Sequence, residues 1–99
     1  MNTEAQKMLN KYPERLPIIV RKHNDKSSVK FLVPKDFTIG QLIYIIKRKT
    51  QISSSDAIFI FTEKNILMTS SSTIEDIYNH HKNKDGFLYF IYSLENTFG

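Results

Sequence analysis

The 99-residue sequence contains no cysteine. The chain therefore has no disulfide framework, no thiolate zinc site and no cysteine nucleophile. It also lacks long apolar runs, because a membrane-spanning helix needs about 20 apolar residues, whereas runs such as 43–46 and 87–92 are short. Residues 1–11 include no apolar block of signal-peptide length. These absences predict a cytoplasmic protein to which any membrane attachment is added chemically.

Patterns that would indicate an enzyme are also missing. His80 and His81 are adjacent and no third ligand is spaced to complete a metal site. The serines at 53–55 and 70–72 lack the glycine-flanked turn of a hydrolase nucleophile. The sequence therefore predicts a binding protein with no metal, no cofactor and no catalytic residues.

What the sequence does contain is the composition of a small globular protein. Hydrophobic residues make up 40% and charged residues 24%, without repeats or low-complexity blocks, which predicts one domain over residues 1–99. The net charge of +4 and the pI near 9.4 favour acidic partners: acidic peptides, anionic lipid surfaces or nucleic acid. Charge alone does not choose among them.

Periodicity and turn signals predict the order of the elements. A short helix within residues 1–11 is capped by Thr3, and the main helix opens with a capping box formed by Thr38 and Gln41. The other predicted elements are strands at 16–22, 29–33, 57–62, 66–68 and 87–92, and a short helix opened by a second capping box at Ser72 and Glu75. A ββαββαβ order after the first helix predicts an α+β fold of the β-grasp kind, a mixed sheet wrapped on one central helix. Residues 93–99 are left as a flexible tail.

The first predicted hairpin is apolar on both faces. If Leu16, Ile18 and Val20 point to the core, then Pro17 and Ile19 point outward, as does Leu32 of the next strand, beside Lys30. One explanation is that the amino-terminal helix covers the outer residues. The other is a groove in which an extended guest peptide adds to the edge strand by β-augmentation.

Residues 30–49, KFLVPKDFTIGQLIYIIKRK, resemble the LVPxDxTVGQ segment of the GABARAP and light-chain-three family of ubiquitin-like autophagy modifiers. The resemblance continues in KYPERLPIIV at 11–20, AIFIF at 57–61, HKNKDGFLY at 81–89 and the terminal ENTFG at 95–99. These blocks follow one another in family order with compatible spacing, so the resemblance covers nearly the whole chain.

The resemblance implies two peptide pockets for an aromatic-x-x-aliphatic motif. The first pocket, for the aromatic residue, is implied at Glu4, Met8, Pro17, Ile19, Lys30, Leu32 and Phe87. The second, for the aliphatic residue, is implied at Phe31, Val33, Pro34, Phe37, Leu42 and Ile45. Arg15 and Lys49 match basic positions near acidic guest residues. Phe31 and Val33 are thereby given a pocket role although their alternation also suits the core, and periodicity leaves both possibilities open.

The resemblance further implies conjugation of Gly99 to phosphatidylethanolamine. The implied partners are E1-like and E2-like conjugating enzymes, a cysteine protease for processing or deconjugation, and autophagy receptors that carry the motif. The implied function is autophagosome formation and cargo-receptor recruitment, in the cytoplasm and, once lipidated, on autophagosomal or other vesicle membranes.

The sequence departs from the family pattern in two places. It has residues for about one amino-terminal helix instead of two, and Ser28 stands where a basic residue is customary. AIFIF at 57–61 matches a further docking strip of the family, but buried strand explains the same residues. The alternative function is an unconjugated β-grasp module that binds tubulin or nucleic acid through a basic patch, although no nucleic acid is expected as a partner.

Overall fold

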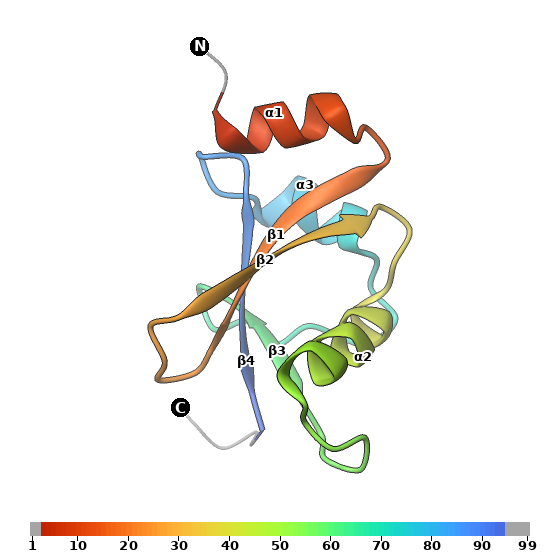
Figure 1. The fold of residues 1–99 in the computed structure, drawn as a ribbon, viewed down its shortest axis with the longest axis vertical. Coiled ribbons are helices and arrows are strands. Elements are labelled where there is room, and N and C mark those ends of the chain that lie inside the picture. Colours follow the sequence, from red (N-terminus) through yellow and green to blue (C-terminus); the bar gives the residue numbers. More distant parts are fainter. Residues whose placement is uncertain (1–2, 95–99) are drawn as a thin grey trace.

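The computed structural model describes residues 3–94 and contains one four-stranded mixed sheet. Its elements, in chain order, are α1 (Glu4–Lys11), β1 (Arg15–Lys22), β2 (Ser28–Pro34), α2 (Ile39–Thr50), β3 (Phe59–Thr62), α3 (Ile74–His81) and β4 (Leu88–Ser93). The strand order is β2-β1-β4-β3, with β1 parallel to β4 and the other neighbours antiparallel. Figure 1 shows α2 crossing one side of this twisted sheet and α1 lying across its upper end. The predicted β-grasp fold is confirmed.

Helix α2 begins where the capping box predicts. The Gln41 amide N–H donates to Thr38 Oγ1 at 3.3 Å, and the Thr38 amide N–H donates to Gln41 Oε1 at 2.9 Å. The last turn carries three cations, which suit the negative end of the helix dipole. One face of α2 buries Ile39, Leu42 and Ile46 against the sheet.

The core lies between α2 and the two central strands. Leu16, Ile18 and Val20 of β1 are buried in it, as their alternation predicts. Strand β4 contributes every second residue in the same way, namely Leu88, Phe90 and Tyr92. Because β1 and β4 run in parallel side by side, the amino- and carboxyl-terminal thirds of the chain form the centre of one sheet.

Two predicted elements differ from the structure. Residues 66–68 form no strand of their own, only an isolated bridge between Leu67 and Phe61. Ile66 and Leu67 are exposed, so longer pairing would bury little of their side chains. The α3 cap lies one residue later than predicted. The Asp76 amide N–H donates to Thr73 Oγ1 at 3.2 Å, while Ser72 is engaged elsewhere by its carbonyl, which accepts from the Ile39 N–H. Ser72 and Thr73 each have an acidic residue three positions later, so the pattern fitted both.

Helix α1 packs on β1 and bears on the two explanations offered for the outer face of the hairpin. Pro17, predicted to lie on the outer face, is fully buried. Ala5 of α1 is also fully buried, and a Cβ added at Gly86 would lie 2.8 Å from the Ala5 Cβ. The amino-terminal helix therefore covers part of the outer hairpin face and leaves Ile19 and Leu32 half-buried.

The carboxyl-terminal strand extends past its predicted end. Ser93 belongs to β4 and is buried, so the predicted tail boundary at 93 lies inside the strand. Gly99 and the rest of 95–99 lie outside the described residues. Among the helices that the structure describes, we find none with the length and apolar character needed to cross a membrane.

A candidate peptide-binding edge

Strand β2 is an edge strand, because it pairs with β1 and has no second neighbour in the described sheet. Its register with β1 places Leu32 opposite Pro17 and Val33 opposite Leu16. An antiparallel pair alternates between residues that bond to the neighbour and residues whose backbone groups point away from it. The register therefore decides which β2 residues offer backbone groups to a guest.

Lys30 and Leu32 are the β2 residues whose backbone groups are open to a guest strand. Just beyond β2, the Lys35 N–H donates to the Glu14 carbonyl at 3.1 Å. This bond shows which residues of β2 form hydrogen bonds with β1. Every second residue of β2 before Lys35 forms backbone hydrogen bonds with β1 in the same way, and these residues include Val33 and Phe31. The N–H and C=O groups of the residues between them, Leu32 and Lys30, face the open edge. The position of Pro17 agrees with this alternation. Proline has no N–H, and opposite Leu32 no hydrogen bond to β2 is required of it.

The Leu32 carbonyl already has a partner within the chain. Arg15, exposed at the start of β1, donates from Nη1 to the Leu32 oxygen at 3.2 Å. Arg15 is one of the predicted basic contacts, and this bond holds its guanidinium at the strand edge. A guest strand that bonds to Leu32 would share or displace this donor.

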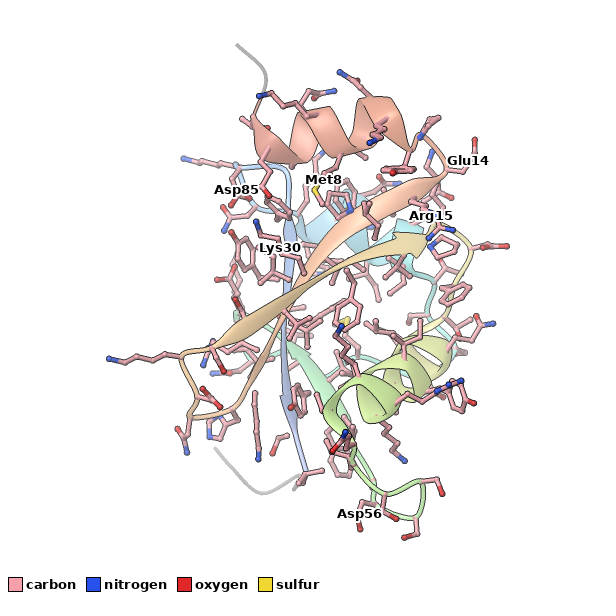
Figure 2. All side chains as sticks on the ribbon, viewed as in Figure 1. Met8, Glu14, Arg15, Lys30, Asp56 and Asp85 are labelled. Atoms are coloured by element: carbon pink, nitrogen blue, oxygen red, sulfur yellow. The ribbon has the colours of Figure 1, made fainter. Side chains whose placement is uncertain are left out.

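The predicted first pocket is assembled from three separate parts of the chain. Lys30 Nζ lies 2.5 Å from Glu4 Oε2 of α1 and 5.7 Å from the ring centroid of Phe87. The Lys30 and Glu4 side chains are 48% and 58% exposed, so the ion pair contributes about 0–1 kcal/mol and opens at little cost. Figure 2 shows Met8 pointing from α1 toward the strands and Lys30 rising from β2 toward the Asp85 turn.

Burial separates the floor of this pocket from its walls. Pro17 and Phe87 are buried and can only form a floor. Met8, Ile19 and Leu32 are half-buried and offer apolar surface around it, while Glu4 and Lys30 are exposed at the rim. Ile19 also lines a cleft of about 210 Å³ on the outer face of the sheet, bordered by Arg21, Lys26 and Tyr89.

A hydrogen-bond network that was not predicted from the sequence lies beneath this pocket. Asp85 accepts from the Phe87 N–H at 2.9 Å through Oδ1 and from the Tyr89 hydroxyl through Oδ2. The Asp85 hydrogen bond, followed by burial and the nearby carboxylates, raises the pKa of Tyr89 to about 12. This network fixes the turn that places Phe87. The only sequence signal for it is the alternation of Asp85, Phe87 and Tyr89.

The predicted second pocket combines core and surface residues between β2 and α2. Val33 and Leu42 are buried members of the main core. Phe31 and Phe37 pack on that core while remaining half-exposed, and Pro34 and Ile45 are also half-buried. Phe31 therefore packs on the core and keeps exposed surface beside the predicted second pocket, whereas Val33 lies in the core.

The remaining predicted contacts are spread more widely. Lys49 is exposed in the last turn of α2. In the 57–61 segment Ile58, Ile60 and Phe61 are buried, as expected of core strand, and β3 begins at Phe59 instead of Ala57. No group of three or more metal-ligating side chains occurs within residues 3–94.

Comparisons with known proteins agree on one family. A family model described as "Autophagy protein Atg8 ubiquitin like" matches residues 1–99. Autophagy-related protein 8 of Schizosaccharomyces pombe is 46% identical over 103 residues, covering 98% of this chain and 84% of that protein. Autophagy-related protein 8d of Arabidopsis thaliana is 46% identical over 102 residues, covering 97% and 83%. The crystal structure of Trypanosoma brucei ATG8 superposes with a TM-score of 0.85 at 40% identity, covering 97% of this chain and 86% of that one.

Proposed function

Because this chain belongs to the Atg8 family of autophagy-related ubiquitin-like modifiers, which are not enzymes, we propose that it is a lipid-conjugated docking protein of autophagosomes. Gly99 would be joined to phosphatidylethanolamine by E1-like and E2-like enzymes and released by a cysteine protease. The folded part would recruit receptors that carry aromatic-x-x-aliphatic motifs. The family assignment does not favour an unconjugated module that binds tubulin or nucleic acid.

The observation that supports the docking proposal is the edge of β2, which lies between two apolar surfaces and has no second strand neighbour within residues 3–94. A guest strand would bond to the backbone of Lys30 and Leu32. Its aromatic residue would lie on Pro17 and Phe87, and its aliphatic residue, three positions later, between Phe31 and Phe37. Three residues span about 10 Å in an extended chain, a reach that carries a guest from one pocket toward the other. Arg15 and Lys49 would attract acidic residues of the guest.

The conjugation proposal rests on Gly99. A glycine has no Cβ, so an enzyme cleft can bring its carbonyl to a nucleophile without a steric clash. Each CH₂ of an acyl chain contributes about 0.8 kcal/mol when buried in a bilayer, so the two chains of phosphatidylethanolamine anchor a folded domain durably.

The docking proposal is tested by isothermal titration calorimetry with an aromatic-x-x-aliphatic peptide. Replacing Phe31 and Leu32 together by alanine removes an anchor from each pocket and should weaken binding by about 2–4 kcal/mol. Tyr44→Ala is the control, because Tyr44 is 61% exposed on α2 and outside both pockets. Equal affinities of the double variant and the control would contradict the proposal.

The conjugation proposal is tested in cells. Gly99→Ala should abolish the faster-migrating lipidated band and the membrane puncta, whereas Thr97→Ala in the same tail should keep both. Lipidation of the Gly99 variant at the normal level would refute the assigned site.

A further inference from the structure

A basic cleft lies where the end of α3 meets the turn after β3. Its volume is about 390 Å³, within the size range of small-ligand sites. Three lysines and two histidines line it, namely Lys64, Lys82, Lys84, His80 and His81. We call it the lysine cleft. These five residues are separate from the two predicted peptide pockets.

The three lysines have no counter-ion within the part of the chain that the structure describes. No ion pair of residues 3–94 includes Lys64, Lys82 or Lys84. Among the described residues that line the cleft, Glu63 is the single carboxylate, and its Oε1 accepts from Asn83 Nδ2 at 3.4 Å. The lysines therefore leave the cleft with a net positive charge.

The histidines contribute less to this charge. His80 is engaged by its own helix, because its Nδ1 lies 2.8 Å from the Asp76 carbonyl oxygen and 3.7 Å from Asp76 Oδ1. His81 is exposed beside it and offers ring nitrogens to a ligand. Attraction of an anion therefore depends mainly on the lysines.

The turn that carries Lys82 and Lys84 is fixed by the residue between them, Asn83. The Asn83 N–H donates to the Phe87 carbonyl at 2.8 Å, and the Asn83 carbonyl accepts from the Gly86 N–H at 3.0 Å. Asn83 Oδ1 accepts from the Lys84 N–H at 2.6 Å, while Nδ2 bonds to the turn after β3. These bonds set the backbone positions of both lysines before a ligand arrives.

Lys82 and Lys84 also border a second hollow, of about 530 Å³, on the α1 side of their turn. The lining of that hollow includes the Asp85 carboxylate and does not include Lys64, so the positive charge is concentrated in the lysine cleft. Lys82 Nζ lies 5.4 Å from the ring centroid of Tyr78, which borders the second hollow. Because the Lys82 side chain is exposed, it can turn from this ring to a ligand at little cost.

Phosphate groups suit this arrangement better than carboxylates do. A phosphate group carries up to about two negative charges and three acceptor oxygens, whereas a carboxylate carries a single charge. A lysine ammonium has three donors on a flexible stem and binds phosphate as a point charge. Several ammonium groups around one compact hollow therefore match several phosphates held on one small scaffold.

We propose that the lysine cleft binds a compact polyphosphate group, carried by a soluble molecule or by a lipid headgroup. Lys64 contacts the phosphates from the turn after β3, and Lys82 and Lys84 contact them from the end of α3. Glu63 opposes the ligand and limits its affinity. The inference does not rest on the proposed function, since it involves neither the peptide pockets nor Gly99.

Binding is measured by isothermal titration calorimetry of the full chain with inorganic tripolyphosphate. Glutamine at all three cleft lysines should weaken binding about tenfold. The control changes the net charge equally at three exposed lysines outside the cleft, with glutamine at Lys7, Lys11 and Lys26. Equal losses in the two triple variants would overturn the proposal, as would a parent chain that does not bind.

A variant with the opposite effect guards against loss of folding. Glu63→Gln keeps an oxygen that accepts from Asn83 but removes the negative charge, so it should tighten tripolyphosphate binding about two- to fivefold. Circular dichroism checks the fold of every variant. Unchanged or weaker binding in Glu63→Gln would overturn the placement of the ligand in this cleft.

Two further probes distinguish the sources of the phosphates. Inositol hexakisphosphate represents a soluble ligand, and phosphatidylcholine vesicles that contain phosphatidylinositol bisphosphate represent a lipid headgroup. The probe that binds the parent chain more tightly than the triple cleft variant identifies the source. A glutamate oligomer, or phosphatidylserine vesicles of equal charge, that binds as tightly would overturn the polyphosphate in favour of general attraction to anions. None of these probes contains an aromatic-x-x-aliphatic peptide, so their failure is distinct from failure of the proposed function.

Discussion

At the scale of single residues, the hydrogen bond from Tyr89 to Asp85 is the strongest perturbation of an ionisable group below the first pocket. The bond favours the neutral phenol and raises the pKa of Tyr89 to about 12. Since the folded-state pKa lies above the ordinary value of about 10, the stabilisation is fully present below pH 10 and disappears as the pH rises through 12.

We therefore expect Asp85→Asn to bring the titration of Tyr89 back toward pH 10. The measurement is absorbance at 295 nm during alkaline titration, with Tyr89→Phe identifying the contribution of this group among the five tyrosines. Asp76→Asn, which removes an exposed carboxylate of α3, is the control. An Asp85 variant that titrates like the parent would show that the bond does not control Tyr89.

Gly86 holds the turn before β4 in a conformation that other residues rarely adopt. Its φ is +89°, and an added Cβ would lie 2.8 Å from the Ala5 Cβ. Gly86→Ala should lower the free energy of unfolding by about 1–3 kcal/mol. The matched control is Gly40→Ala in α2, where the nearest contact is an ordinary 3.5 Å and alanine should stabilise the helix by about 0.5–1 kcal/mol. Urea denaturation measures the free energy of unfolding of both variants. Equal destabilisation by the two substitutions would contradict the close approach of α1 to Gly86.

At the scale of elements, the start of α3 distinguishes two candidate N-caps, Ser72 and Thr73, that the sequence pattern fitted equally well. Thr73→Ala removes the acceptor of the Asp76 N–H and should cost about 1 kcal/mol, as expected for an N-cap. Ser72→Ala loses only an exposed hydroxyl bond to Thr69 and should cost less than half as much. Thermal or urea unfolding of the two variants decides the cap, and a larger loss in Ser72→Ala would restore the position predicted from the sequence.

The strands show what periodicity can and cannot predict. Alternation placed Leu16, Ile18 and Val20 correctly because one side of β1 has only the core to face. It could not decide whether the outer face with Pro17 is open or covered, since that is set by how α1 docks, and the docking depends on the close approach of Ala5 to Gly86, far away in the sequence. The hydrogen bond from the Arg15 guanidinium to the Leu32 carbonyl likewise cannot be predicted from the alternation of side chains.

At the scale of the whole molecule, the parallel pairing of β1 with β4 joins the two ends of the chain, while α1 remains peripheral. Most of the main core comes from β1, β2, α2, β3, α3 and β4, with Leu9 of α1 packed at its margin. Figure 1 shows α1 lying across the end of the sheet instead of within it. The fold should therefore survive without α1, but not without the last strand.

A chain that begins at Tyr12 should accordingly unfold cooperatively, with a free energy of unfolding lower by about 3 kcal/mol, because Pro17 and Phe87 lose their cover. The same chain should bind an aromatic-x-x-aliphatic peptide more weakly, since Glu4 and Met8 no longer border the first pocket. Urea denaturation and calorimetry measure the two effects. Glu4→Gln with Met8→Ala in the full chain is the control that should reduce affinity with little loss of stability. A chain without α1 that unfolds without cooperativity would show instead that the helix is part of the folding core.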